Sequence, residues 1–220
     1  MPRIGVVLAG CGFLDGSEIH EAVLTLYHLD RCGVDTECFA PDRDQLHVVN
    51  HATGDPTDEV RNVRVEAARV ARGPVADLAD ARASALDAVV IPGGFGVAKN
   101  LSDFALKGPE CDVNSDLVRL IGEVVAAGKP VVAICIAPAI LAAVLKRQGI
   151  SGVTLTVGDD ADTAGAVADL GQAHQPCAVE EISVDEANRV ICTPAYMLGP
   201  GPAAVGEGIG RAIDQMMAWL

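Results

Sequence analysis

The feature that most constrains the fold is the apolar segment 131–140 (VVAICIAPAI), in which four apolar residues lead directly into Cys135. Residues 131–134 suit a buried strand, and the residues after Cys135 read as the start of a helix. A cysteine at a strand-to-helix turn sits above the end of a parallel sheet, near helix amide groups that favour a negative charge. The run therefore predicts a thiolate nucleophile, although a cysteine in an apolar run is by itself more often structural.

The rest of the chain alternates between apolar strand patterns and helical patterns. Strands are expected at residues 3–9, 34–40, 87–91, 130–134 and 153–157, with a strand pair at 182–185 and 189–193. Helices are expected at residues 17–31 with Ser17 as the cap, and at 57–72, 116–127, 136–149, 162–170 and 203–220. Residues 42–62 read as a long irregular loop. The alternation predicts an α/β fold with a mainly parallel sheet covered on both faces.

Composition limits the class of protein. The chain has 220 residues, half of them hydrophobic, which predicts a single domain over residues 1–220 with a sizeable core. A formal net charge of -14 argues against nucleic acid and anionic membrane surfaces as partners. The seven cysteines are scattered with no C-x-x-C pair, so we expect neither a disulfide framework nor a metal site. A cytoplasmic protein is the expectation.

Three segments are expected to meet at the carboxyl edge of the sheet: the glycine loop 10–16, residues 92–96 and the Cys135 turn. Glu18 and Glu21 open the helix that follows the glycine loop, where a carboxyl group can move protons beside a thiol. The backbone amides of Gly94 and Ile136 are candidates for an oxyanion hole.

Each of these features also has a plain structural explanation. Acidic residues are favoured at a helix start without any catalytic role, and a glycine pair suits a tight turn. A Cys-His enzyme often places its base beside the nucleophile, but position 136 is Ile, and the five histidines carry only a weak signal. Neither glycine loop has the spacing of a phosphate or dinucleotide site.

Several segments resemble the PfpI/ThiJ superfamily and, more closely, its ElbB family of isoprenoid-biosynthesis glyoxalases. The segments that carry the resemblance are 10–21 (GCGFLDGSEIHE), 49–54 (VNHATG), 61–63 (RNV), 92–101 (PGGFGVAKNL), 133–138 (AICIAP) and 193–198 (TPAYML). The resemblance implies a flavodoxin-like three-layer sandwich similar to class I glutamine amidotransferase domains. It also implies a homodimer and a glyoxalase that needs no glutathione, metal or other cofactor.

On this resemblance Cys135 takes the position of the reactive cysteine and Glu21 that of the catalytic glutamate, with Glu18 at a neighbouring acidic position. Gly93, His20 and Asn100 complete the candidate pocket, which is expected to be small and polar. Ile136 stands where the peptidase branch has histidine, so proteolysis is not expected.

The working hypothesis is a glyoxalase III-like lyase acting on a small dicarbonyl or aldehyde. A protonated Glu21 helps to set the Cys135 thiolate, which attacks glyoxal, or alternatively methylglyoxal, to form a hemithioacetal. Glu21 or Glu18 then moves a proton between the two carbons, and hydrolysis releases the 2-hydroxy acid. Two alternatives stay open: a non-enzymatic redox sensor that oxidises at Cys135, and a small-molecule-binding protein that acts through a partner.

Overall fold

Seven strands form one sheet in the computed structural model, which describes residues 1–199 and 201–220, in the order β10-β11-β7-β6-β1-β2-β5. The strands are β1 (Arg3–Val7), β2 (Asp35–Ala40), β5 (Ala76–Asp77), β6 (Ala88–Ile91), β7 (Val131–Ile134), β10 (Ser183–Asp185) and β11 (Val190–Thr193). β10 runs antiparallel to β11, and every other pairing in this sheet is parallel. The predicted mainly parallel sheet with its terminal strand pair is confirmed.

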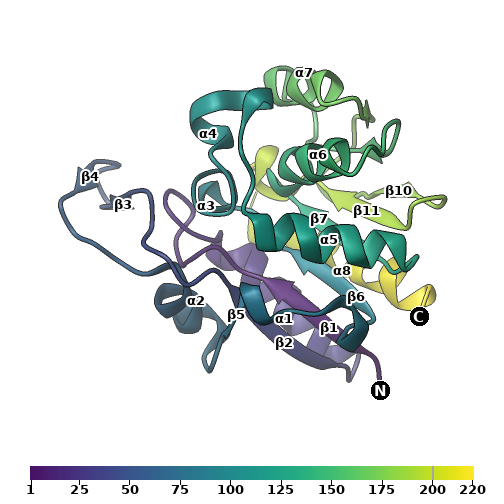
Figure 1. Ribbon diagram of the computed structural model, residues 1–220, viewed down its shortest axis with the longest axis horizontal. Coiled ribbons are helices and arrows are strands. Elements are labelled where there is room, and N and C mark those ends of the chain that lie inside the picture. The colour runs from purple at the N-terminus through teal and green to yellow at the C-terminus, as the bar shows by residue number, and fades with distance from the viewer. Residues whose placement is uncertain (200) are drawn as a thin grey trace.

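Helices cover both faces of the sheet, so the fold has three layers (Figure 1). One face packs against α3 (Phe95–Lys99), α4 (Phe104–Lys107), α5 (Ser115–Ala126), α6 (Ala137–Arg147) and α7 (Ala161–Asp169). The other packs against α1 (Ile19–Arg31), α2 (Val63–Ala71) and α8 (Pro202–Ala218). Short 3-10 turns are η1 (Leu78–Asp80), η2 (Ala83–Ala85), η3 (Gly108–Glu110) and η4 (Ala195–Met197).

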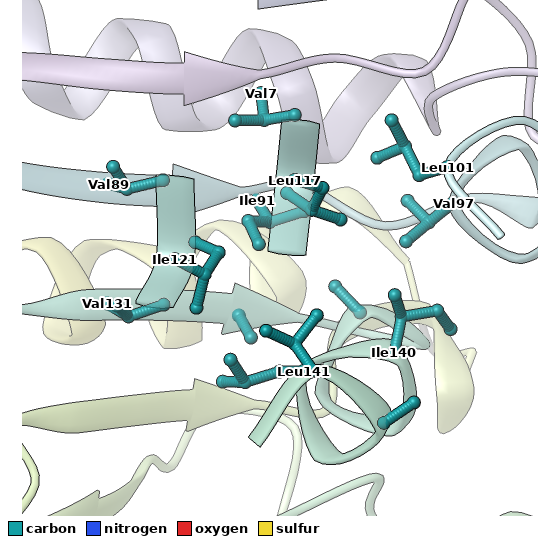
Figure 2. Close-up of a cluster of buried hydrophobic side chains, with 14 of the residues drawn as sticks. Val7, Val89, Ile91, Val97, Leu101, Leu117, Ile121, Val131, Ile140 and Leu141 are labelled. Atoms are coloured by element: carbon teal, nitrogen blue, oxygen red, sulfur yellow. The ribbon is translucent and has the colours of Figure 1, made fainter. Parts of the chain in front are cut away.

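The core on the α5–α6 face shows why the parallel strands are so apolar. Strand side chains meet helix side chains directly, because a parallel sheet is buried on both faces (Figure 2). The labelled residues are Val7, Val89, Ile91, Val97, Leu101, Leu117, Ile121, Val131, Ile140 and Leu141. Each such side chain contributes about 1.5–3 kcal/mol when fully buried, so the strand that delivers Cys135 is firmly held.

Three expectations near the chain start are wrong in detail. Residues 42–62 are not wholly irregular: β3 (Val48–Val49) and β4 (Pro56–Thr57) pair as an antiparallel hairpin. α2 therefore begins at Val63 and not at residue 57, with Asn62 accepting hydrogen bonds from the amides of the first turn. Ser17 does not cap α1, because its hydroxyl accepts a hydrogen bond from the Ala9 amide, and Glu18 is the cap.

The expected strand at residues 153–157 does not join the main sheet. β8 (Thr154–Leu155) pairs instead with β9 (Ala173–His174) in a separate two-stranded sheet. β10 already occupies the edge beside β11, which leaves β8 no place in the main ladder. The Thr154 amide of β8 donates to the carboxylate of Asp185 in β10 at 2.8 Å, and this bond connects the small sheet to the large one.

Candidate active site

Cys135 occupies a strained turn between β7 and α6. Its φ of +63° lies in the left-handed region, which costs a residue other than glycine about 1–2 kcal/mol. The Cys135 amide donates to the Thr193 carbonyl at 2.9 Å, and this bond fixes the turn to the neighbouring strand β11. The residue is 7% exposed, and that small exposed part faces a cavity at the carboxyl edge of the sheet. Strain maintained by the surrounding structure is typical of functional residues.

Glu21 of α1 is the acid that contacts this cysteine. It is fully buried, and its carboxyl group shares a hydrogen bond with the Cys135 side chain. Oε2 accepts a hydrogen bond from the Gly93 amide at 2.9 Å, and Oε1 accepts one from the Tyr196 amide at 3.2 Å. These bonds hold the carboxyl group in one orientation beside the sulfur atom.

Burial dominates the protonation of this pair. It raises the pKa of Glu21 to about 8, with the nearby Glu18 charge adding to the effect and the hydrogen bonds opposing it. Burial also raises the pKa of Cys135, while the amides of Gly94 and Ile136, which donate to the sulfur, oppose the shift. Glu21 therefore carries a proton at neutral pH. Desolvation opposes the expected preformed thiolate and favours the thiol until a reaction removes its proton.

The two glycines after β6 allow this close approach. A Cβ on Gly93 would lie 2.4 Å from the Cys135 Cβ and 2.6 Å from Glu21 Oε2. Gly94 has a φ of +95°, and a Cβ there would lie 2.3 Å from the Glu18 amide nitrogen. Only glycine fits at either position, since both clashes involve fixed atoms.

The cavity beside Cys135 has a volume of about 380 Å³ and largely apolar walls. Phe13, Phe95, Ile136 and Met197 line it. The expectation of a small polar pocket is wrong, because aromatic and aliphatic side chains from four separate segments converge here. A larger hollow of about 680 Å³ lies against β2, α1 and the end of α2, but no residue of the Cys135 site lines it.

The two glutamates occupy different places. Glu18 lines the cavity, and its Oε2 accepts a hydrogen bond from the Glu21 amide at 2.7 Å. Glu21 lies behind the sulfur with both oxygens already bonded. Glu18 is therefore the carboxyl group with access to a ligand.

None of the three candidate pocket residues lines the cavity: the Gly93 amide holds Glu21 behind the sulfur, and the other two make different contacts. Asn100 is buried, but its Nδ2 donates to the carbonyls of Ala9 and Asp15, both at 2.8 Å, and its Oδ1 accepts from the Leu46 amide. It fixes the loop between β1 and α1 and does not line the cavity. His20 is exposed, and its Nδ1 hydrogen-bonds the Tyr196 hydroxyl at 2.6 Å, so it reaches the cavity only through that tyrosine.

Six cavity residues were missed by sequence reasoning: Phe13, Phe95, Asp160, Thr163, Tyr196 and Met197. Tyr196 and Met197 belong to the 193–198 segment, which carries family resemblance but no chemical pattern of its own. Asp160 caps α7 by accepting from the Thr163 amide at 2.8 Å, and a helix-capping aspartate carries no sign of a ligand site in the sequence.

No group of three or more metal-ligating side chains is found among residues 1–199 and 201–220. Within the same residues no helix combines the length and apolarity required to cross a bilayer.

A strained cysteine above a parallel sheet, backed by a buried glutamate from the first helix, defines a cysteine site on a class I glutamine amidotransferase-like fold. The chain belongs to the DJ-1/PfpI family, whose model matches residues 11–166. The expected superfamily and fold are thereby confirmed.

Relatives match over nearly the whole chain. The human protein named glutamine amidotransferase-like class 1 domain-containing protein 3, mitochondrial, is 44% identical over 98% of this chain and 82% of its own length. The rat ES1 protein homolog, mitochondrial, is 43% identical over 98% of this chain and 83% of its own.

Solved structures agree with this assignment. A crystal structure from Ehrlichia chaffeensis, of an isoprenoid biosynthesis protein with an amidotransferase-like domain, superposes with a TM-score of 0.91 and 38% identity. That alignment covers 99% of this chain and all of the other. Drosophila melanogaster DJ-1beta superposes with a TM-score of 0.59 at 18% identity over 99% and 94% of the two chains, which shows the shared fold.

Proposed function

We propose that this protein is a cofactor-independent glyoxalase that converts a 2-oxoaldehyde to the 2-hydroxy acid through a covalent bond to Cys135. The observation that carries the proposal is the placement of the strained Cys135 sulfur between the Glu21 carboxyl group and the cavity. An aldehyde carbon is electrophilic enough to react with a thiol whose proton is transferred during the attack.

The first step adds the thiol across the aldehyde. The sulfur forms a bond to the aldehyde carbon, the carbonyl oxygen takes the proton, and the product is a hemithioacetal. In the resting site the amides of Gly94 and Ile136 donate to the sulfur. Once sulfur is bonded to carbon it accepts hydrogen bonds poorly, so the same two amides are free to stabilise the new oxyanion. Such donors contribute about 3 kcal/mol each to a developing negative charge.

The second step moves a proton between the two carbons. Glu18 is the better placed carboxyl group, because it lines the cavity while both Glu21 oxygens are held by backbone amides. Glu18 removes the proton from the hemithioacetal carbon and returns it to the adjacent carbon through an enediol. The result is a thioester, which water hydrolyses to the hydroxy acid and the free thiol.

Amidotransferase and peptidase chemistry are less well supported. Both reactions require a base that activates the cysteine and a group that protonates a nitrogen leaving group, a role that histidine commonly fills. No histidine belongs to the described lining of the cavity, and position 136 is Ile. His20 is bonded to the Tyr196 hydroxyl and does not reach the sulfur.

The working compartment is proposed to be reducing. All seven cysteines are free, which fits the cytoplasm or another reducing compartment. The human and rat relatives carry the word mitochondrial in their names.

The test is turnover of glyoxal and methylglyoxal by the purified protein without glutathione, followed as release of the hydroxy acid. Cys135→Ala is expected to abolish turnover, and Glu18→Gln to lower kcat by about 10²–10⁴-fold, as for loss of a general base. Cys32→Ser is the matched control, because Cys32 is exposed at the end of α1. Full turnover by Cys135→Ala would refute the proposal.

A further inference from the structure

The cavity beside Cys135 is larger and more apolar than glyoxal, the smallest dialdehyde, requires. A volume of about 380 Å³ lies within the range of pockets that enclose drug-sized ligands. Resting on the proposed function, we propose that this cavity selects neutral carbonyl substrates with an apolar substituent of ring size, such as an aryl 2-oxoaldehyde. The substituent would lie between the aromatic walls while the aldehyde reaches Cys135.

Two phenylalanine rings form the walls and stand partly open to solvent. Phe13 is 47% exposed and Phe95 is 48% exposed. Exposed large apolar side chains that group around a cavity are typical of a ligand site, because their exposure to water is unfavourable unless a ligand covers them. A substrate with an aryl or branched alkyl group would cover both rings.

Both rings are fixed in place before any ligand arrives. The Phe95 amide donates to the Phe13 carbonyl at 2.8 Å, which links the two segments. His51 packs edge-on against Phe13 with ring centroids 5.4 Å apart, and the Lys99 ammonium lies 5.5 Å from the Phe95 ring centroid. Walls that are already ordered lose little conformational entropy on binding, so they contribute directly to selectivity.

Two further lining residues are apolar. Ile136 and Met197 line the cavity together with Cys135. A methionine side chain adapts to ligands of different shape, because it is unbranched and flexible. This arrangement favours substituents of varied shape and does not single out one compound.

Charge on the cavity lining selects against anionic substrates. Glu18 and Asp160 both line the cavity, and hydrogen bonds from Thr163 hold the pKa of the Asp160 carboxyl below its usual value. The described lining holds no lysine or arginine, and Lys99, which contacts the Phe95 ring, donates its ammonium to the Leu14 carbonyl at 2.8 Å. A carboxylate or phosphate on the substrate would therefore meet two acids and no compensating base.

The experiment compares kcat/KM for glyoxal, methylglyoxal, phenylglyoxal and 4-carboxyphenylglyoxal. Hydroxy acid release is followed by chromatography, so that side reactions of the aldehydes with arginine are not counted. Phenylglyoxal is expected to exceed glyoxal by about tenfold or more, and the carboxylated analogue to lose that advantage.

Variants separate binding from the intrinsic reactivity of each aldehyde. Phe13→Ala is expected to lower the ratio of phenylglyoxal to glyoxal turnover by about tenfold. Leu106→Ala is the control, because Leu106 is 64% exposed on α4 and does not line the cavity. Asp160→Asn is expected to restore turnover of 4-carboxyphenylglyoxal, and asparagine keeps the helix cap.

The outcomes distinguish this inference from the proposed function. If Cys135 is required for turnover but Phe13→Ala leaves the ratio unchanged, the substrate inference is wrong and the glyoxalase proposal stands. If no aldehyde is turned over, the glyoxalase proposal is wrong, and the inference is tested by the thermal shift that acetophenone causes in Cys135→Ala. A shift that disappears when Phe13→Ala is added to this variant would support an aryl carbonyl site. The absence of any shift would overturn the inference.

Discussion

The Glu21→Gln substitution tests the electrostatics of the site through protein stability, independently of any substrate. Burial raises the pKa of Glu21 from its ordinary value of 4.5 to about 8. Between these two values the folded protein keeps a proton that the unfolded chain has lost. The free energy of unfolding therefore falls as pH rises from about 4.5 to about 8, at up to 1.4 kcal/mol per pH unit. Above pH 8 both states are ionised and this contribution stops changing.

The size of the effect follows from the shift. A rise of roughly 3.5 pKa units corresponds to about 5 kcal/mol of stability lost across the whole window. Glutamine has no such titration, but it introduces a fixed cost. Both oxygens of Glu21 accept backbone amides, from Gly93 and Tyr196, and glutamine offers only one oxygen. The remaining amide faces an NH₂ group, at a cost of about 1–3 kcal/mol.

The wild-type and variant stability curves are therefore expected to cross. Near pH 5 the variant is less stable by the cost of the lost acceptor, and near pH 8 it is the more stable protein. Urea unfolding at intervals of one pH unit measures both curves, and their difference cancels the titrating groups that do not interact with Glu21. Glu207→Gln is the control, since Glu207 is exposed on α8. Parallel curves for wild type and Glu21→Gln would refute the assignment of a protonated, buried Glu21.

Further predictions concern the geometry of the site. Gly93→Ala is expected to abolish turnover and to destabilise the fold by about 1–3 kcal/mol, measured by urea unfolding, because the new Cβ clashes with Cys135 and Glu21. Cys135→Gly is expected to be more stable than Cys135→Ala by about 1 kcal/mol in the same assay, because glycine relieves the positive φ. Asn100→Ala is expected to cost about 3 kcal/mol, since three backbone groups lose their partner. Peroxide titration with peptide mapping tests the sensor alternative: oxidation confined to Cys135, together with absent aldehyde turnover, would favour it.

The sheet was predictable because parallel strands are buried on both faces and so appear as unbroken apolar runs. β1, β6 and β7 all carry this signal, and their bounds differ from the expected ones by one or two residues. Short elements lack it: β5 has two residues, and its pairing with β2 depends on tertiary contacts. β8 carries a strand pattern but pairs outside the main sheet. The sequence does not predict this pairing, because a strand pattern does not reveal which edge of the sheet is already occupied.

The site was predictable where local backbone geometry determines the chemistry. A strand followed at once by a helix start places Cys135 at the edge of the sheet, and a glycine pair after the neighbouring strand allows close approach. The apolar walls were not predictable, because Phe13, Phe95 and Met197 come from separate loops and short helices. No periodicity connects them, and only the fold brings them to one cavity.

The protonation state of the cysteine shows why local context alone is insufficient. A helix start after the strand favours a thiolate, and the Gly94 and Ile136 amides do donate to the sulfur. Yet the same fold buries the sulfur and removes water, which favours the neutral form. Two amides and a neutral acid beside a desolvated thiol are better suited to stabilising charge that appears during a reaction than charge held at rest. This arrangement supports the proposed reaction, in which an aldehyde accepts the proton as its carbon is attacked.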